Sequence, residues 1–407
     1  MRYDTATTPP VRYGYGVIGI PGVVAGLTKL HQQHGSLPLS VVMQPAIKYA
    51  KKGFELLPGE ARRQAAAIDQ LKEFKGSRKY FLEDGQARQA GEKWVQKDLA
   101  NTLTAISKDG HDAFYKGPIA QKIVADFQAN GGLLTMEDMA NYKAETSRIV
   151  KGNYRGYDIH GLWLPSFGAI TIEILHILEN WSQEQLKGEE WGYALSQAIR
   201  LAYQDRQKQK LENTDSIMQI LLSKEYARTL YQQLPNDSRT GFQSESMPES
   251  WVAEMGHTTH LSTADEKGMM VALTQTIGPN MGSKVATDGL GFLYAVTLGK
   301  YLGVYEPGHR ASSHVSPMLI TKNNQPYMVL GAAGGSRIPT AITAVISGII
   351  DRDLSLEKAL TRPRVYATDN TVLIESHLPE SWSSEEINQF KSRALKVEQI
   401  ESGRRNY

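Results

Sequence analysis

The sequence predicts a fold of the α+β class, or a layered αββα arrangement, with helices in the first part and sheet in the second. Apolar side chains recur every three or four positions through much of residues 17–212, which favours helices. From residue 257 onward, β-branched residues alternate with polar ones, which favours strands. The chain has 407 residues, 41% hydrophobic and 22% charged, so it can form one large globular domain or two ordinary ones.

The helices of the first half are predicted from periodicity and from their end signals. In GIPGVVAGLTKLHQQHG, Pro21 lies near the first turn of a helix and Gly35 lies just past its end. The segment GYDIHGLWLP is strand-like. Further helices are expected over residues 40–55, 59–75, 98–132 (two helices), 169–185 and 190–212.

The second half begins with a predicted β-hairpin. TTHLST and MVALTQT are its strands, and ADEKG is the turn. SPMLITKNNQPYMVLGAA repeats this strand–turn–strand pattern, RIPTAITAVISGIIDRDL is an apolar helix, and NTVLIES is a late strand. Residues 213–256 are polar and weakly patterned, so a long exposed segment is expected to precede the hairpin.

Composition excludes several kinds of site and partner. The net charge is +2 without a basic block, which argues against a nucleic-acid partner. The chain has no cysteine, so disulfides, cysteine-bound zinc and a thiol nucleophile are excluded. No apolar run is long enough to span a membrane. MRYDTATTPPVRYGYG has no apolar h-region, so no signal peptide is expected within this sequence.

The hairpin opens with His257, Thr258, Thr259 and His260, and this motif has three interpretations. As a metal site it is poor, because residues 257 and 260 of a strand point to opposite faces and the Glu of HExxH is missing. We therefore predict no metal and no cofactor. As ordinary strand, the threonines serve only β-propensity. As a reactive site, Thr258 is a nucleophile freed by chain cleavage, with its new α-amine as the base that activates its own hydroxyl.

An ordered set of motifs makes the sequence similar to the γ-glutamyltranspeptidase (γ-glutamyltransferase) family. GIPGVVAGL, DAFYKGPIA, GGLLTMEDMANY, GNYRGYDI and AIRLAYQDR look like its large-subunit signatures. TTHLS, ALTQTIGPNMGS, SSHVSP and GAAGGSRI follow in the family's order. Each motif is weak alone, but together they are specific.

This resemblance implies the four-layer αββα sandwich of an N-terminal-nucleophile hydrolase. Self-cleavage between His257 and Thr258 would give a large subunit, residues 1–257, and a small subunit, residues 258–407. The two subunits would form one intertwined domain, a heterodimer from a single precursor. The expected substrate is a γ-glutamyl amide such as glutathione, with water or an amine as acceptor. The family further implies a periplasmic or extracellular location.

The resemblance also implies roles for individual residues. Thr258 would be the nucleophile, Thr259 would contact the substrate, and Thr276 would hydrogen-bond the nucleophile. The remaining expected site residues are the substrate-carboxylate pair Ser312 and Ser313, and the oxyanion-hole pair Gly334 and Gly335. Independently, GGSRIP suits the start of a helix, with Ser336 as N-cap and Pro339 in the first turn, where backbone donors stabilise an oxyanion.

The sequence also departs from the family pattern. No acidic residue lies between Gly289 and Gly303, where well-known members have an acidic pair that binds the substrate's α-amine, and Gly278 replaces an expected Asn. The match starts after the family's usual N-terminal segment and stops before its closing strands. We therefore expect an N-terminally incomplete sandwich: a fragment, a chain completed by a partner, or the product of a truncated gene. Two other functions stay open, a glutaryl- or cephalosporin-type acylase and an unprocessed, non-catalytic remnant.

Overall fold

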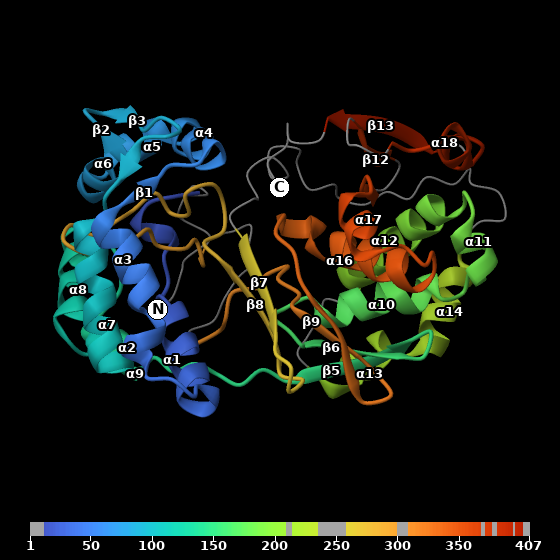
Figure 1. The fold of residues 1–407 in the computed structure, drawn as a ribbon, viewed down its shortest axis with the longest axis horizontal. Helices are drawn as coiled ribbons and strands as arrows, with labels where there is room; N and C mark the ends of the chain where they lie inside the picture. Colours follow the sequence, from blue (N-terminus) through green and yellow to red (C-terminus); the bar gives the residue numbers. More distant parts are fainter. Residues whose placement is uncertain are drawn as a thin grey trace. The chain divides into compact units, whose positions relative to one another are not determined.

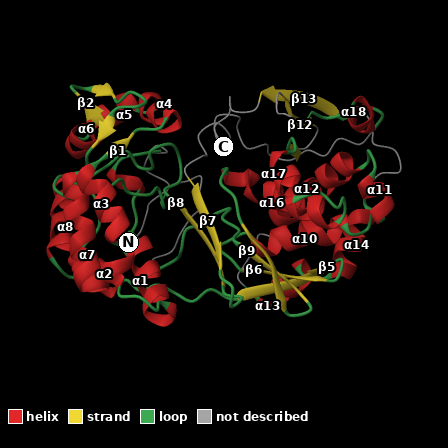
Figure 2. Cartoon of the chain, in the orientation of Figure 1, coloured by secondary structure: helices red, strands yellow, loops and turns green. Residues whose placement is uncertain are grey.

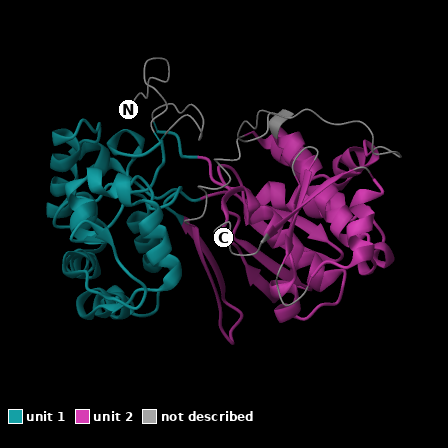
Figure 3. Cartoon of the chain, turned by 90° about the horizontal axis from the view of Figure 1, so that it is seen from above, with its two compact units in different colours: residues 1–146, 276–311 teal, residues 147–275, 312–407 magenta. Residues whose placement is uncertain are grey.

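The computed structural model describes residues 12–208, 214–234, 258–298, 308–367, 371–376, 381–393 and 395–401 (Figure 1). Helices are joined to small, mainly antiparallel sheets (Figure 2). The chain forms two compact units, Met1–Thr146 with Thr276–Ala311, and Ser147–Gln275 with Ser312–Tyr407 (Figure 3). The predicted division at residue 257 concerns cleavage of the chain, a property separate from these units, and it stays a prediction.

Unit 1 is mainly helical, and its strands are short pairs. Its centre is aromatic: the Phe127 ring lies 5.3 Å from Tyr15 and 5.2 Å from Tyr294, both edge to face. The residue 276–311 segment thus contributes Tyr294 to a core built by N-terminal helices. The elements are η1 Tyr15–Val17, α1 Val23–His34, α2 Leu39–Val42, α3 Gln44–Lys52, β1 Phe54–Glu55, α4 Pro58–Ala66, α5 Ile68–Glu73, α6 Lys75–Phe81, β2 Leu82–Glu83, β3 Gln86–Ala87, β4 Lys93–Trp94, α7 Lys97–Tyr115, α8 Pro118–Ala129 and α9 Met136–Asn141.

Unit 2 is built on an antiparallel sheet with the strand order β10-β9-β6-β5. In its centre Ile159 pairs with Ile320, and both are fully buried. A second sheet has the order β11-β12-β13, where β12 and β13 are parallel. The elements are β5 Ile149–Tyr154, β6 Tyr157–Leu162, α10 Gly168–Leu178, α11 Gln183–Lys187, α12 Trp191–Lys208, α13 Asp215–Leu221, α14 Lys224–Gln232, β7 Thr258–Ala264, β8 Met270–Thr276, β9 Met318–Lys322, β10 Gln325–Leu330, η3 Gly335–Arg337, α16 Ile338–Ile350, α17 Leu356–Thr361, β11 Val365–Ala367, β12 Thr371–Ser376, α18 Ser384–Lys391 and β13 Lys396–Glu401.

Helix α10 is the centre of the unit 2 core. All of its residues are buried, as expected for GAITIEILHIL, which is apolar on almost every side. It packs on β5 and β6 and also contacts α12, α14 and α16. The approach to β5 is close, because a Cβ at Gly152 would lie 2.4 Å from Ile172. The apolar helix predicted at 337–354 is α16, and it too is almost wholly buried.

The structure also corrects one prediction. Residues 213–256 were expected to form an exposed segment, but part of this stretch forms α13 and α14. Thr214 and Ser223 cap these helices, and Ala227 and Leu230 are buried. The polar composition hid two amphipathic helices whose cap residues were visible in the sequence. Residues 235–257 lie outside the described part of the chain.

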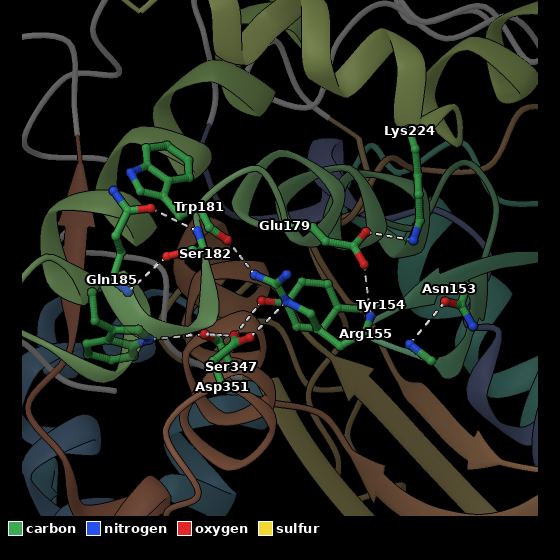
Figure 4. Close-up of polar contacts among 12 residues, drawn as sticks. Asn153, Tyr154, Arg155, Glu179, Trp181, Ser182, Gln185, Lys224, Ser347 and Asp351 are labelled. Atoms are coloured by element: carbon green, nitrogen blue, oxygen red, sulfur yellow. Dashed lines mark hydrogen bonds and ion pairs between the residues drawn. The ribbon is translucent and has the colours of Figure 1, made fainter.

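The C-terminal end of α16 is held by a buried carboxylate (Figure 4). Asp351 is 0% exposed. It accepts hydrogen bonds from the hydroxyls of Tyr154 and Ser347, the latter at 2.6 Å, and from Arg155 Nε at 3.2 Å. Arg155 also donates to the Trp181 carbonyl at 2.6 Å. Burial raises the pKa of Asp351, and these donors partly offset the effect.

We expect Asp351→Ala to lower the free energy of unfolding by about 3–5 kcal/mol, because it leaves the partly buried Arg155 and two buried hydroxyls without their shared acceptor. Urea unfolding followed by circular dichroism measures this loss. Asp109→Ala, at an exposed position of α7, is the control and should change stability by less than about 0.5 kcal/mol. Equal effects of both substitutions would show that Asp351 does not anchor the helix.

Candidate functional site

The predicted hairpin is confirmed, and it begins at Thr258 and ends at Thr276. β7 and β8 pair with each other. The Asp265 side chain accepts from the backbone N–H groups of Lys267 and Met269 at 3.0 and 2.9 Å, and Gly268 supplies a φ of 87°. ADEKG is therefore the turn that the sequence predicted, and its chemistry fixes the register of the two strands.

The two threonines of the doublet occupy opposite faces of β7. Residues two apart in a strand share a face, so Thr258 lies on the face of His260 while Thr259 lies on the other. Burial agrees: Thr258 and His260 are half-buried and Thr259 is exposed. The His260 face meets Gly331, where a Cβ would be 2.4 Å from His260 Nδ1. Thr258 thus belongs to the side of β7 that faces the segment leading to Gly334.

His260 is the histidine of the motif that the structure describes, and two hydroxyls contact its ring. His260 Nδ1 lies 2.8 Å from Thr274 Oγ1, and its Nε2 lies 2.8 Å from Ser262 Oγ. Burial lowers the pKa of His260, which favours a neutral ring between two hydroxyls. Within the described ranges, no group of three or more His, Asp or Glu side chains is placed to hold a metal. His257 lies outside the described residues.

The glycine pair forms a tight turn before α16. Gly334 has a φ of 135° and Gly335 a φ of 60°, conformations that side chains other than Gly rarely adopt. Pro339 lies in the first turn of α16, as predicted. Ser336 does not cap the helix, contrary to the prediction: its hydroxyl is 3.3 Å from Tyr366 Oη, because the intervening 3₁₀ turn moves the start of α16 to Ile338.

Helix α12 contacts both loops that carry predicted site residues. The Tyr203 hydroxyl donates to the carbonyl of Ser336, in the glycine turn. Arg206 Nη2 donates to Ser312 Oγ at 3.3 Å. The Ser313 N–H donates to the Pro165 carbonyl at 3.0 Å. The loop that carries Ser312 and Ser313, called the serine loop below, is thus also bonded to the turn before α10. Tyr203 and Arg206 were not predicted as site residues, although both lie in the AIRLAYQDR motif.

Thr276 and the segment after it complete the predicted set. Thr276 Oγ1 accepts from the Gly278 N–H at 3.0 Å. In the described part of the acid-free stretch, residues 290–298, Thr297 Oγ1 accepts from the Gly19 N–H at 2.8 Å. A threonine thus anchors part of the stretch in which the resemblance would have put an acidic pair.

A cavity of about 430 Å³ in unit 2 adjoins the glycine turn, because Ala333 and Arg337, which flank Gly334 and Gly335 in the sequence, line it. It is bounded by α16, α17 and the β11-β12-β13 sheet, with Arg337, Tyr366 and Glu375 among its polar residues. None of the residues that line it belongs to the predicted site. The cavity therefore adjoins one of the predicted loops without containing a predicted site residue.

Comparison with known proteins supports the resemblance. The family model described as Gamma-glutamyltranspeptidase matches residues 2–404. The glutathione hydrolase proenzyme of Pseudomonas sp. (strain A14) is 34% identical over 381 residues, covering 87% of this chain and 65% of that protein. The glutathione hydrolase proenzyme of Escherichia coli (strain K12) is 32% identical over 380 residues, covering 86% and 64%. The chain thus spans slightly less than two thirds of the length of these curated relatives.

A solved structure extends the likeness to the fold. The cephalosporin acylase from Bacillus halodurans superimposes with a TM-score of 0.84 and 26% identity, covering 97% of this chain and 73% of that chain. This confirms the predicted α+β class and its N-terminal-nucleophile hydrolase sandwich. Among the described residues, no helix has both the length and the apolar character of a membrane span.

Two acidic residues lie on the neighbouring helices α10 and α12. Glu173 is 0% exposed and Asp205 is 3% exposed. Burial raises the pKa of Glu173 well above its usual range, and the charge and hydrogen bond of Asp205 raise it further. The folded protein therefore keeps a proton on Glu173 at pH values where the unfolded chain has released it.

We predict that the free energy of unfolding falls as pH rises from the ordinary Glu pKa, roughly 4.3, through the raised pKa of Glu173. The slope can reach about 1.4 kcal/mol per pH unit, and the curve levels off above the raised pKa. Glu173→Gln removes this titration, so its unfolding free energy in urea should depend less on pH between 5 and 8. Glu225→Gln, at an exposed position, is the control and should follow the wild type. A Glu173→Gln curve parallel to the wild type would contradict the prediction.

Proposed function

Because the chain belongs to the gamma-glutamyltranspeptidase family, we propose that it is an acyl-transfer enzyme with Thr258 as its nucleophile. One observation carries the proposal: Thr258 begins β7 on the face of His260, which packs against Gly331, three residues before the turn at Gly334. A hydroxyl at the start of a strand becomes an N-terminal nucleophile when the preceding peptide bond is cut.

Cleavage would use the same hydroxyl. Thr258 Oγ attacks the carbonyl carbon of His257, the peptide C–N bond breaks, and the residue 257 acyl group moves from nitrogen to oxygen. Water then hydrolyses this ester, which frees the Thr258 hydroxyl and its α-amine. The relatives named above are described as proenzymes, which supports processing into two subunits that stay together as a heterodimer.

Turnover would repeat this chemistry on a substrate. The α-amine, with a pKa of roughly 7.7–8.0, takes the Thr258 proton as Oγ attacks the amide carbonyl. The C–N bond breaks, the proton leaves with the amine, and an ester remains on Thr258 until water or an amine accepts the acyl group. The backbone N–H groups of Gly334 and Gly335 would stabilise the oxyanion, each donor contributing about 3–4 kcal/mol.

The other predicted residues take roles around this ester. The contact between the His260 and Thr274 side chains across the hairpin favours a register in which Thr276 lies opposite Thr258, where it would hydrogen-bond it. Ser312 and Ser313 would bind a substrate carboxylate, with Thr259 as a further contact. The substrate class is a γ-glutamyl amide such as glutathione. A periplasmic or extracellular location stays a prediction from the family resemblance.

An acylase acting on a glutaryl-type group is the second candidate. The acid-free stretch after Gly289 favours it, since an α-ammonium substrate needs a carboxylate partner. The similarity to a cephalosporin acylase points in the same direction. The unprocessed, non-catalytic remnant is the third candidate, and a test of cleavage distinguishes it from both enzymes.

We expect the purified chain to separate on a denaturing gel into residues 1–257 and residues 258–407. Thr258→Ala should stay intact, because it lacks the attacking hydroxyl. Mass spectrometry of the smaller piece checks that it begins at Thr258. Thr259→Ala is the matched control and should still cleave. Cleavage of Thr258→Ala at the same bond would exclude Thr258 as the nucleophile.

We expect weak discrimination between γ-glutamyl and glutaryl anilides, which differ only in the α-amine. A charge-assisted contact to that amine contributes about 1.5–3 kcal/mol, and the acid-free stretch does not supply it. The ratio of the two kcat/KM values should stay below about a hundredfold, or about 2.7 kcal/mol. A larger preference for the γ-glutamyl anilide would mean that another residue binds the amine.

A further inference from the structure

Arg206 contacts both the serine loop and Phe167. Its Nη2 lies 3.3 Å from Ser312 Oγ, and its Cζ lies 3.6 Å from the centre of the Phe167 ring. The second contact is a close cation–π stack, which fixes the plane of the guanidinium. The same Phe167 donates its N–H to the Val315 carbonyl at 3.0 Å. Arg206 is therefore attached both to the loop and to the residue on which the loop rests.

The neighbouring ring does not share the positive charge. His314 lies 4.3 Å from Phe167, on the loop that carries Ser312. Burial lowers the pKa of His314 to about 3, and the charge of Arg206 contributes to the same shift. His314 is thus neutral at physiological pH, while a guanidinium stays protonated. Arg206 is the cation of this group.

The contact also orients a hydroxyl. A guanidinium has only donors, so Ser312 Oγ must be the acceptor in its contact with Arg206. The hydroxyl hydrogen of Ser312 therefore points away from the guanidinium and serves as a donor. A carboxylate that accepts this hydrogen would lie in the field of the Arg206 charge, two hydrogen bonds away.

We propose that Arg206 is a specificity-determining residue, which makes the serine loop selective for the carboxylate of the acyl donor by acting through Ser312. This inference rests on the proposed function, which brings the donor to Ser312 and Ser313. It adds a cation on α12, a residue that the family resemblance did not assign. The selected ligand carries a free carboxylate at the end of its acyl chain distant from the scissile amide.

The test compares two ligands of equal length in the Thr258→Ala chain, which cannot turn them over. One is 4-carbamoylbutanoate, with a carboxylate and an amide, and the other is pentanediamide, which is neutral. Isothermal titration calorimetry should show that Arg206→Gln weakens binding of the carboxylate about tenfold or more and changes binding of the diamide by less than about twofold. Arg206→Lys keeps the charge and should recover part of the affinity.

Arg393→Gln is the matched control. Arg393 stacks 4.2 Å over Tyr193 of α12, so this variant removes another arginine that stacks on an aromatic ring, without touching the serine loop. It should leave both affinities within about twofold of the parent chain. Equal losses for the two ligands in Arg206→Gln would overturn the proposal, and so would unchanged carboxylate binding or a parent chain that does not bind 4-carbamoylbutanoate.

The outcome is separable from that of the proposed function. Binding is measured in a chain that needs neither cleavage nor turnover, whereas the proposed function is tested by processing of the wild type. If carboxylate selectivity depends on Arg206 but the wild type does not cleave, the reaction is excluded and the role of Arg206 stands as a property of ligand binding alone. If the wild type cleaves and Arg206→Gln binds the carboxylate normally, the inference alone fails.

Discussion

The buried carboxylate of Asp351 is the contact on which the arrangement of unit 2 depends. A carboxylate with 0% exposure loses its hydration, and it is stable there only with well-placed donors. Two of these donors, Tyr154 and Arg155, come from the end of β5 and the turn that follows it, so the network joins the central sheet to the last turn of α16. Because a helix is stiff, holding its C-terminal end also restricts the glycine turn at its other end.

Helix α12 also holds α16 in place. The distance between its two donors is close to the distance between the two acceptors that they reach. Trp191 Nε1 donates to Ser347 Oγ at 3.0 Å, and Tyr203 donates to the Ser336 carbonyl. Along α12 the two donors are about 18 Å apart at 1.5 Å per residue, and the two acceptors, Ser336 in the 3₁₀ turn and Ser347 in α16, are about 17 Å apart. The start of α12 contacts the end of α16, and the end of α12 contacts the turn before α16, so the two helices run in opposite directions. Helix α10 packs against both.

Local patterns predicted the elements well, and distant contacts account for what they missed. The hairpin at 258–276 follows from β-branched alternation, and the helix at 338–350 follows from an apolar run with a proline in its first turn. The family motifs likewise identified candidate threonines, serines and glycines, because each motif is a short contiguous stretch that can be read directly from the sequence. Tyr203 and Arg206 reach partners 133 and 106 residues away, and such pairs cannot be read from spacing. Ser336 has the sequence context of a cap, yet a 3₁₀ turn intervenes.

The alternation of side chains along β7 places the two threonines of the doublet on opposite faces of the strand. A shift of one residue would exchange the faces of Thr258 and Thr259. Two contacts of His260 oppose that shift. Its ring hydrogen-bonds Thr274 across the hairpin, and it packs against Gly331, where a Cβ would be 2.4 Å from the ring. A histidine two residues along the strand thus fixes which threonine lies on the side of Gly331, and under the proposed function the choice of nucleophile follows from strand register.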